Sequence, residues 1–341
     1  MTVTQASAPI VRHAPIDVAR LCLALVVVLG HGRFLEDIDP ALFYGLVTTL
    51  GRLVVPFFLM VSGYFFLAGT RNGIGAWFAN VAKLYLFWSA IYLPLVFLIE
   101  EMSVPKLGFY LIFGFAHLWY LPALAGGGLV LWLVRAWPPG RILRLALGLY
   151  LAGAAAQFAL NHIVGTESLP HRNAWTVVPR NFLFMGFPFL AAGYVAAREG
   201  WAGRADGRWV AAAILALLPL FGLEQWANWR ALGLSGITDI WLCVAPLAPL
   251  VFIAVLKLPL ARAPRRLPGI AAAIYFVHPI FVFGLWEVTA LGGTAVALIS
   301  VALSLVSALL LVQANRIVGL VRRPGRREGR PGNGGSQPAS L

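Results

Sequence analysis

Charge and cysteine are scarce in this sequence. Asp, Glu, Lys and Arg make up only 11% of its 341 residues, whereas an ordinary soluble domain has about 25%. Hydrophobic residues reach 60%, and the mean hydropathy is +0.83. These values exclude a soluble globular protein and, away from the chain ends, a disordered one. The two cysteines, Cys22 and Cys243, lie in apolar stretches, so we expect neither a disulfide framework nor a cysteine zinc site.

The few charged residues are strongly unbalanced in sign. Lys and Arg total 26 against 13 Asp and Glu, which gives a net charge of +13. A basic excess of this kind often indicates a nucleic-acid partner. Here the charges are too few and the apolar runs too long for that class of protein. We therefore expect a lipid bilayer as partner and no nucleic acid.

Long apolar runs indicate a polytopic membrane protein, because about 20 mostly apolar residues cross the hydrocarbon core as a helix. The sequence predicts an all-α bundle of about ten transmembrane helices. The region 108–136 is too long for one straight helix, so its first part, 108–116, is predicted to be re-entrant or interfacial. The predicted spans are 16–34, 42–69, 76–99, 117–136, 142–160, 178–197, 208–227, 237–257, 269–289 and 294–316.

The basic residues predict the orientation of these spans. With the N-terminus in the cytoplasm, 20 of the 26 Lys and Arg residues fall on the cytoplasmic side, as the positive-inside rule requires. Both termini are then cytoplasmic. The predicted domains are a leader (1–15), a membrane domain (16–316) and a basic, disordered cytoplasmic tail (317–341). No cleavage site follows the first apolar run, so we expect it to remain as the first helix.

Ionisable side chains within the first span are candidate functional groups, because they are costly in a membrane. Arg20 and His31 are eleven residues apart, which places them on one helix face about 16 Å apart along the axis. Asp17 is close enough to Arg20 to pair with it. Such a stripe must line a polar interior rather than face lipid. Both a packed structural network and a site with a basic anchor and a titratable imidazole fit this pattern.

Other candidates are weaker one by one. Ser62 and the following glycine fit close helix packing or local unwinding. His117, with Trp119 and Tyr120 behind it, fits a membrane-boundary anchor, and His278 in mid-span fits a packed core histidine. Three acidic residues near predicted span ends could simply be hydrated. Two arginines inside spans are not explained by topology. These five residues are Glu224, Asp239, Glu287, Arg52 and Arg180.

In combination, these segments resemble the acyltransferase family 3 integral membrane proteins, which acylate bacterial surface polysaccharides and related glycoconjugates. The resemblance covers residues 16–316 and rests on five segments in order. They are IDVARLCLALVVVLGH (16–31), PFFLMVSGYFF (56–66), HLWYL (117–121), RNFLFMGFPFLAAGY (180–194) and IYFVHP (274–279). One departure concerns a basic pair often found at the start of the third helix. Here the stretch reads NVAK (80–83), with a single cation.

The resemblance implies a multi-pass protein of the bacterial inner membrane that uses acyl-CoA, most often acetyl-CoA, and no metal. The acceptor is a hydroxyl of a cell-surface glycan or lipid-linked sugar. We expect His31 to be the general base, because only histidine titrates near neutral pH without strong perturbation. The further catalytic residues are Arg20 and Asp17. Cofactor contacts are expected from Arg20, Arg71 and Lys83. Substrate contacts are expected from Arg52, Ser62, His117, Trp119, Tyr120, Arg180, His278 and Glu287.

Two questions stay open at this level. A bundle with a polar interior also fits a transporter or flippase for a glycan or small metabolite, although no inverted repeat is visible. Within the acyltransferase interpretation, the acceptor, the choice between acetyl and succinyl, the oligomeric state and a covalent intermediate on Ser62 are not fixed by the sequence.

Overall fold

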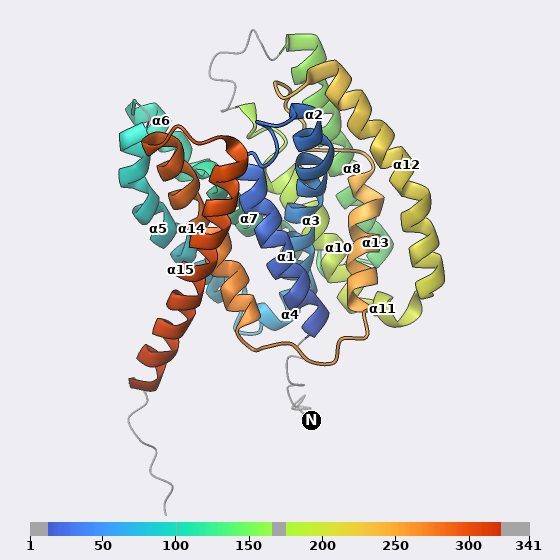
Figure 1. Cartoon of the computed structure of the whole chain (residues 1–341). Helices are drawn as coiled ribbons and strands as arrows, with labels where there is room; N and C mark the ends of the chain where they lie inside the picture. The colour runs from blue at the N-terminus through green and yellow to red at the C-terminus, as the bar shows by residue number, and fades with distance from the viewer. Residues whose placement is uncertain (1–12, 100, 166–174, 322–341) are drawn as a thin grey trace, which may run out of the picture.

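The computed structural model describes residues 13–99, 101–165 and 175–321, and within these ranges the chain is helical with no strand (Figure 1). The helices in the first half are α1 (Ala14–His31), α2 (Pro40–Leu42), η1 (Phe43–Thr48), α3 (Thr49–Tyr64), α4 (Phe66–Gly69), α5 (Ile74–Ile99), α6 (Val104–Phe113), η2 (Ala116–Trp119) and α7 (Tyr120–Val134). Those in the second half are α8 (Pro139–Ala159), η3 (Leu160–Gly165), η5 (Phe182–Gly186), α10 (Phe187–Arg198), α11 (Trp201–Arg204), α12 (Gly207–Leu232), α13 (Val244–Leu256), α14 (Leu267–Val288) and α15 (Gly293–Val321).

The predicted membrane helix bundle is confirmed. Eight helical stretches in the described ranges are long and apolar enough to cross a membrane. The predicted spans 178–197 and 237–257 correspond to shorter apolar helices, Phe182–Arg198 and Val244–Leu256. The number of ten crossings and the cytoplasmic termini therefore stay predictions.

The predicted break inside 108–136 is present. Helix α6 ends at Phe113, and Gly114 then adopts a φ of +89°, a backbone conformation that favours glycine. A single 3-10 turn, η2, leads from there into α7. The break places the side chains of η2 inside the bundle, where His117 and Leu118 are buried.

The domain boundaries stay predictions. Helix α1 begins at Ala14, within the predicted leader, and α15 continues to Val321, past the predicted start of the tail at residue 317. The rest of both predicted segments, 1–12 and 322–341, lies outside the described residues.

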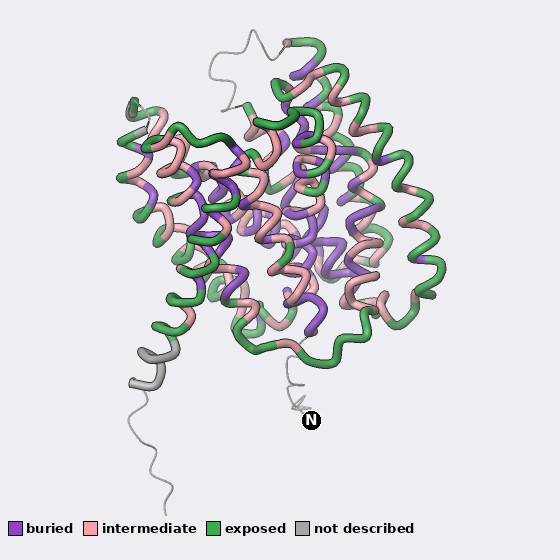
Figure 2. Tube along the Cα trace, in the orientation of Figure 1, coloured by how far each residue is buried: buried purple, intermediate pink, exposed green. Residues whose placement is uncertain are grey.

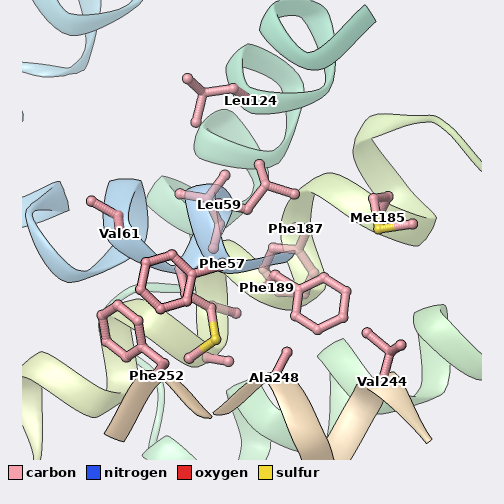
Figure 3. Packing of buried hydrophobic residues seen from close by; sticks show 14 of the residues in the cluster. Phe57, Leu59, Val61, Leu124, Met185, Phe187, Phe189, Val244, Ala248 and Phe252 are labelled. Carbon is pink, nitrogen blue, oxygen red and sulfur yellow. The ribbon is translucent and has the colours of Figure 1, made fainter. Parts of the chain in front are cut away.

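Helix α10 lies at the centre of the bundle, and every residue from Phe187 to Ala196 is buried (Figure 2). This agrees with its sequence, which is apolar on all sides. Aromatic and aliphatic side chains of α3, α7 and α13 pack against those of α10 (Figure 3). The bundle is thus built around α3 and α10, and the remaining helices surround them.

Glycine allows α3 and α10 to cross closely. A Cβ atom on Gly63 would collide with the backbone carbonyl of Leu190, and one on Gly193 would collide with that of Met60. Small residues permit such close backbone contact between membrane helices. Of the two alternatives that the sequence left open at Ser62 and Gly63, close packing or local unwinding, the structure shows close packing.

The direction of the helices sets the two ends of the bundle. His13, next to α1, lies 3.3 Å from the Tyr64 hydroxyl at the end of α3, measured from its Nε2 atom. Helices α1 and α3 are in contact and run in opposite directions, so His31 and Arg52 both lie toward the other end. We call the end at His13 the N-terminal end and the other the far end.

Residues 237–241 depart from the predicted span 237–257, because they have no regular secondary structure although four of the five are buried. Side-chain amides supply the missing backbone hydrogen bonds. Asn161 donates to the Ile237 carbonyl (2.7 Å) and accepts from its N–H (3.0 Å), and Gln157 does the same for Ile240 at 2.7 and 2.8 Å. Buried backbone needs such partners, and these two amides favour an irregular backbone over a helix.

Candidate active site

Three histidines from distant parts of the sequence lie together inside the bundle. The ring centroids of His31 at the end of α1 and His278 in α14 are 5.2 Å apart. His117 of η2 completes the cluster, 5.3 Å from His278. His278 and His117 are buried, with 0% and 2% exposure, whereas His31 is exposed. His31 is therefore the member of this histidine cluster that a substrate can reach.

Proline fixes the orientation of His278. Pro279 has no N–H group, so it cannot donate the usual helical hydrogen bond to the carbonyl of Tyr275. The Nδ1 atom of His278 takes this place at 2.8 Å from the Tyr275 oxygen, and it lies 3.2 Å from that of Ile274. Carbonyls only accept, so Nδ1 carries the proton and Nε2 is left as an acceptor. This Nε2 atom is buried and has no hydrogen-bond partner in the described ranges.

One short segment, 117–120, contributes three contacts to the site. The backbone carbonyl of His117 accepts a hydrogen bond of 2.8 Å from the Tyr275 hydroxyl. The ring of Trp119 lies 5.8 Å from the guanidinium carbon of Arg180, an arrangement that favours a cation–π contact. The Tyr120 hydroxyl lies 3.2 Å from that of Ser62. These three residues thus contact Tyr275, Arg180 and Ser62. Their predicted contacts with substrate stay a prediction.

Ser62 is held by hydrogen bonds that fit a positioning role. Its hydroxyl lies 3.1 Å from the Phe58 carbonyl one helical turn earlier, as well as close to Tyr120. Serine in mid-helix commonly makes this type of bond. No histidine is hydrogen-bonded to Ser62 in the part of the chain that the structure describes, so the geometry does not activate it as a nucleophile.

Two arginines share one carboxylate at the far end of the bundle. Oδ1 of Asp239 lies 2.7 Å from Nη1 of Arg52 and 2.9 Å from Nη2 of Arg180. Arg52 also donates to the Thr238 hydroxyl at 3.1 Å. We call Arg52, Arg180 and Asp239 the arginine clamp. Arg180 lies within electrostatic reach of His31, so the clamp is next to the histidine cluster.

Asp239 was not predicted as a site residue, because its position near a span end is equally typical of a hydrated carboxylate. The informative signal was the pair of arginines inside spans, since a buried cation needs an anionic partner. The identity of that partner was not readable, because the contact joins residues 187 positions apart in the sequence. Glu224, the other acidic residue near a span end that was not predicted as a site residue, accepts hydrogen bonds from backbone N–H groups. The donors are Leu242 and Cys243, which precede α13.

Arg20 lies on the other side of the site. It is partly buried on α1 and within electrostatic reach of Tyr120. Asp17 is buried in the first turn of α1, where the free N–H groups of a helix favour a carboxylate. The ion pairs of the described residues do not include the predicted pair between Asp17 and Arg20.

Three predicted contacts lie away from the histidine cluster. Glu287 is exposed, nine residues beyond His278 on α14, or about 13.5 Å along the helix axis. Arg71, before α5, and Lys83, on α5, are exposed as well. Arg71 follows α4, next to the N-terminal end, where Phe65 packs against His13.

Hydrogen bonds to Thr294 anchor the loop that follows α1. Thr294 near the start of α15 donates from its backbone N–H to the Asp37 carboxylate at 3.0 Å, and its hydroxyl also bonds to that carboxylate. The Thr294 hydroxyl accepts a 3.0 Å bond from the N–H of Leu35. The hydrogen bonds from Thr294 lower the pKa of Asp37, so the carboxylate form holds the loop. In the described ranges, no group of three or more His, Cys, Asp or Glu is placed to hold a metal ion.

Comparison with known proteins adds family and relatives. The model of a family described as "Acyltransferase domain" matches residues 14–313. An amino-acid racemase of Enterococcus faecalis is 28% identical over 206 residues, which cover 54% of this chain and 29% of that protein. A serine/alanine racemase of Enterococcus gallinarum is also 28% identical over 206 residues, covering 55% and 30%. The chain thus aligns with less than a third of each relative. No solved structure matches.

Proposed function

This chain belongs to the acyltransferase domain family, and from that membership we propose that it is an O-acyltransferase of the bacterial inner membrane. It transfers an acyl group, acetyl in the first instance, from acyl-CoA to a hydroxyl of a cell-surface glycan or lipid-linked sugar. The observation that supports this proposal best is one reachable histidine, His31, between two buried histidines and a pair of arginines.

His31 is the general base in this proposal. It accepts the proton of the acceptor hydroxyl while the hydroxyl oxygen attacks the thioester carbonyl carbon. The tetrahedral intermediate then collapses, the carbon–sulfur bond breaks, and the CoA thiolate takes the proton from His31. The products are the ester and free CoA. Arg180 lies within electrostatic reach of His31, and its positive charge favours negatively charged substrate groups beside this base.

His278 and His117 act as positioning residues in this proposal, because both are buried. Nδ1 of His278 donates its proton to backbone carbonyls, which leaves the Nε2 atom of the same ring as an acceptor. The neighbouring imidazole is therefore rigid and keeps the ring of His31 in place. Such support is typical of groups that hold a base in its productive orientation.

The donor is proposed to enter at the N-terminal end. Arg20, Arg71 and Lys83 supply positive charge along this route for the phosphates of CoA. The reactive thioester must then reach His31, about 16 Å farther along α1 than Arg20. The long, narrow pantetheine arm of CoA suits this separation. The acceptor hydroxyl approaches from the far end, where the arginine clamp lies.

The test compares purified protein in lipid nanodiscs with matched histidine variants. Labelled acetyl-CoA and a set of glycan acceptors are supplied, and labelled ester is measured. His31→Ala is expected to abolish product formation although the variant still inserts into the membrane and folds. The matched control is His162→Gln, because His162 is exposed and lies outside the histidine cluster. Full ester formation by His31→Ala contradicts the base assignment. Movement of labelled glycan across the membrane without any ester indicates a transporter instead.

A further inference from the structure

The arginine clamp carries more positive than negative charge. Arg52 and Arg180 both pair with one oxygen of Asp239, and among the described residues neither arginine makes an ion pair with another acid. The three side chains are largely enclosed, with exposed fractions of 19%, 33% and 9% for Arg52, Arg180 and Asp239. A charge excess enclosed in a membrane bundle is costly. Its presence indicates that the clamp has a charged ligand.

Glu224 does not remove this excess. It lies in the same region as Arg52, since both act electrostatically on Tyr150. Its carboxylate oxygens, however, accept hydrogen bonds from the backbone N–H groups of Leu242 and Cys243, at 2.6 and 2.8 Å. These residues precede α13, whose N-terminus carries a partial positive charge that offsets a carboxylate. Glu224 is therefore committed to α13.

The clamp is rigid before any ligand arrives. Asp239 belongs to the buried segment 237–241, whose backbone is fixed on both sides of it by Asn161 and Gln157. Arg52 is tied to the same segment through Thr238 as well as Asp239. A preformed site binds with a smaller loss of conformational entropy than a flexible one. This rigidity suits a binding role.

Arg180 is the accessible half of the clamp. It is the more exposed of the two arginines, its guanidinium lies near the Trp119 ring, and it is within electrostatic reach of His31. Its Nε atom has no hydrogen-bond partner in the described part of the chain. The ion pair with Asp239 therefore does not occupy every N–H donor of the guanidinium. A guanidinium recognises the planar or tetrahedral oxygens of a carboxylate or phosphate through several parallel hydrogen bonds.

We propose that the arginine clamp binds an anionic group of the acyl acceptor, a carboxylate or a phosphate, and so places a neighbouring hydroxyl beside His31. The preferred acceptors are then acidic or phosphorylated sugars rather than neutral ones. This inference rests on the proposed function in one respect, because only acyl transfer identifies the ligand as an acyl acceptor. The binding of the anion itself does not depend on it, and the experiment treats the two separately.

The first experiment measures binding without any acyl donor. The full chain is placed in nanodiscs of phosphatidylcholine, which has no net charge, and its thermal unfolding midpoint is followed as probe is added. The probes are methyl glucuronide, glucose 1-phosphate and neutral methyl glucoside. We expect at least one anionic probe to raise the midpoint and the neutral probe to leave it unchanged. The anion that acts distinguishes a carboxylate ligand from a phosphate ligand.

The second experiment compares arginine variants. For Arg180→Gln, the anion concentration needed for the same rise in the unfolding midpoint is expected to increase at least tenfold. Arg180→Lys is expected to increase it less, because lysine keeps the charge but lacks the parallel N–H donors of the guanidinium. The control is Arg204→Gln, an exposed arginine paired with Glu199. Should Arg180→Gln not fold, Arg180→Lys provides the comparison. Equal effects of neutral and anionic probes, or an unchanged anion effect in the folded variant, overturn the proposal.

The third experiment adds labelled acetyl-CoA and compares ester formation on methyl glucuronide and methyl glucoside. Preference for the anionic acceptor in the wild type, lost in Arg180→Gln, supports the inference. An equal fall for both acceptors assigns Arg180 to the oxyanion and overturns acceptor recognition. If anions bind through Arg180 but no acceptor is acylated, the proposed function fails, and with it the identification of the ligand as an acyl acceptor. If esters form without anion preference, the inference alone fails.

Discussion

Gln157 on α8 is the side chain that most directly positions Asp239. Its amide donates to the carbonyl and accepts from the N–H of Ile240, the residue after Asp239. Replacement of Gln157 by leucine keeps the size of the side chain and removes both hydrogen bonds. Each buried backbone group left without a partner costs about 1–3 kcal/mol. We therefore expect Gln157→Leu to lose about 2–6 kcal/mol of unfolding free energy, or to release segment 237–241 and lose less.

The two responses are distinguished by measuring stability and the clamp together. Unfolding in detergent micelles gives the loss of stability, and anion binding and ester formation report the position of Asp239. The double variant with Asn161→Leu should lose less than the two single losses combined, because both amides hold the same segment. Leu151→Ala is the control, since Leu151 is an exposed residue of α8.

One result refutes this reasoning. If Gln157→Leu unfolds like the wild type and also binds anions and forms ester at the same level, the side-chain amides do not position the segment. The conformation of the segment would then depend on other contacts, such as the 2.7 Å hydrogen bond from the Tyr150 hydroxyl to the Trp241 carbonyl.

Three further predictions concern other parts of the structure. Gly63→Leu should lower the unfolding midpoint by the equivalent of about 1–3 kcal/mol or more, because the new side chain meets the Leu190 backbone. The control is Gly75→Ala, since Gly75 has open space around it. Equal midpoints for the two variants contradict close packing of α3 and α10. The lowered pKa of Asp37 means that its contribution to stability is present above the ordinary carboxyl pKa and is lost as pH falls through the lower folded value. Hydrogen exchange in the loop 32–39 should therefore rise on acidification below about pH 4, and Asp37→Asn should remove this pH dependence. Ser62→Ala should retain ester formation and lose only about 0.5–1.5 kcal/mol of stability; complete loss of ester in a folded variant would point to Ser62 as an acyl carrier.

The features that follow from local periodicity could be predicted from the sequence. The all-α membrane bundle follows from the lengths of the apolar runs, and the shared face of Arg20 and His31 follows from helical geometry. The break before His117 was predicted from excess length alone. The segment 237–241 was not predicted, because its apolar residues are typical of a helix. Its irregular backbone depends on the amides of Gln157 and Asn161, more than 70 residues earlier in the chain.

The histidine cluster shows a similar division. His31, His117 and His278 were each named as candidates, but their contact joins three helices that are distant in the sequence. The proline after His278 was visible, and it determines which carbonyl the imidazole meets, because residue i of a helix normally donates to residue i−4. The local direction of the ring was thus encoded nearby. Its neighbours depend on how α1 and α14 pack, which no short pattern specifies.

The arrangement of charges also explains why the site extends along the bundle. Arg20 acts on Tyr120 on one side of the segment 117–120, and Arg180 lies near Trp119 on the other. In the proposed reaction, two substrates must meet at one imidazole without sharing one binding surface. A donor and an acceptor that both carry negative charge would repel each other at a single basic site. Separate arginines on opposite sides of His31 allow each substrate its own cation, and only the thioester and the hydroxyl need to approach the base.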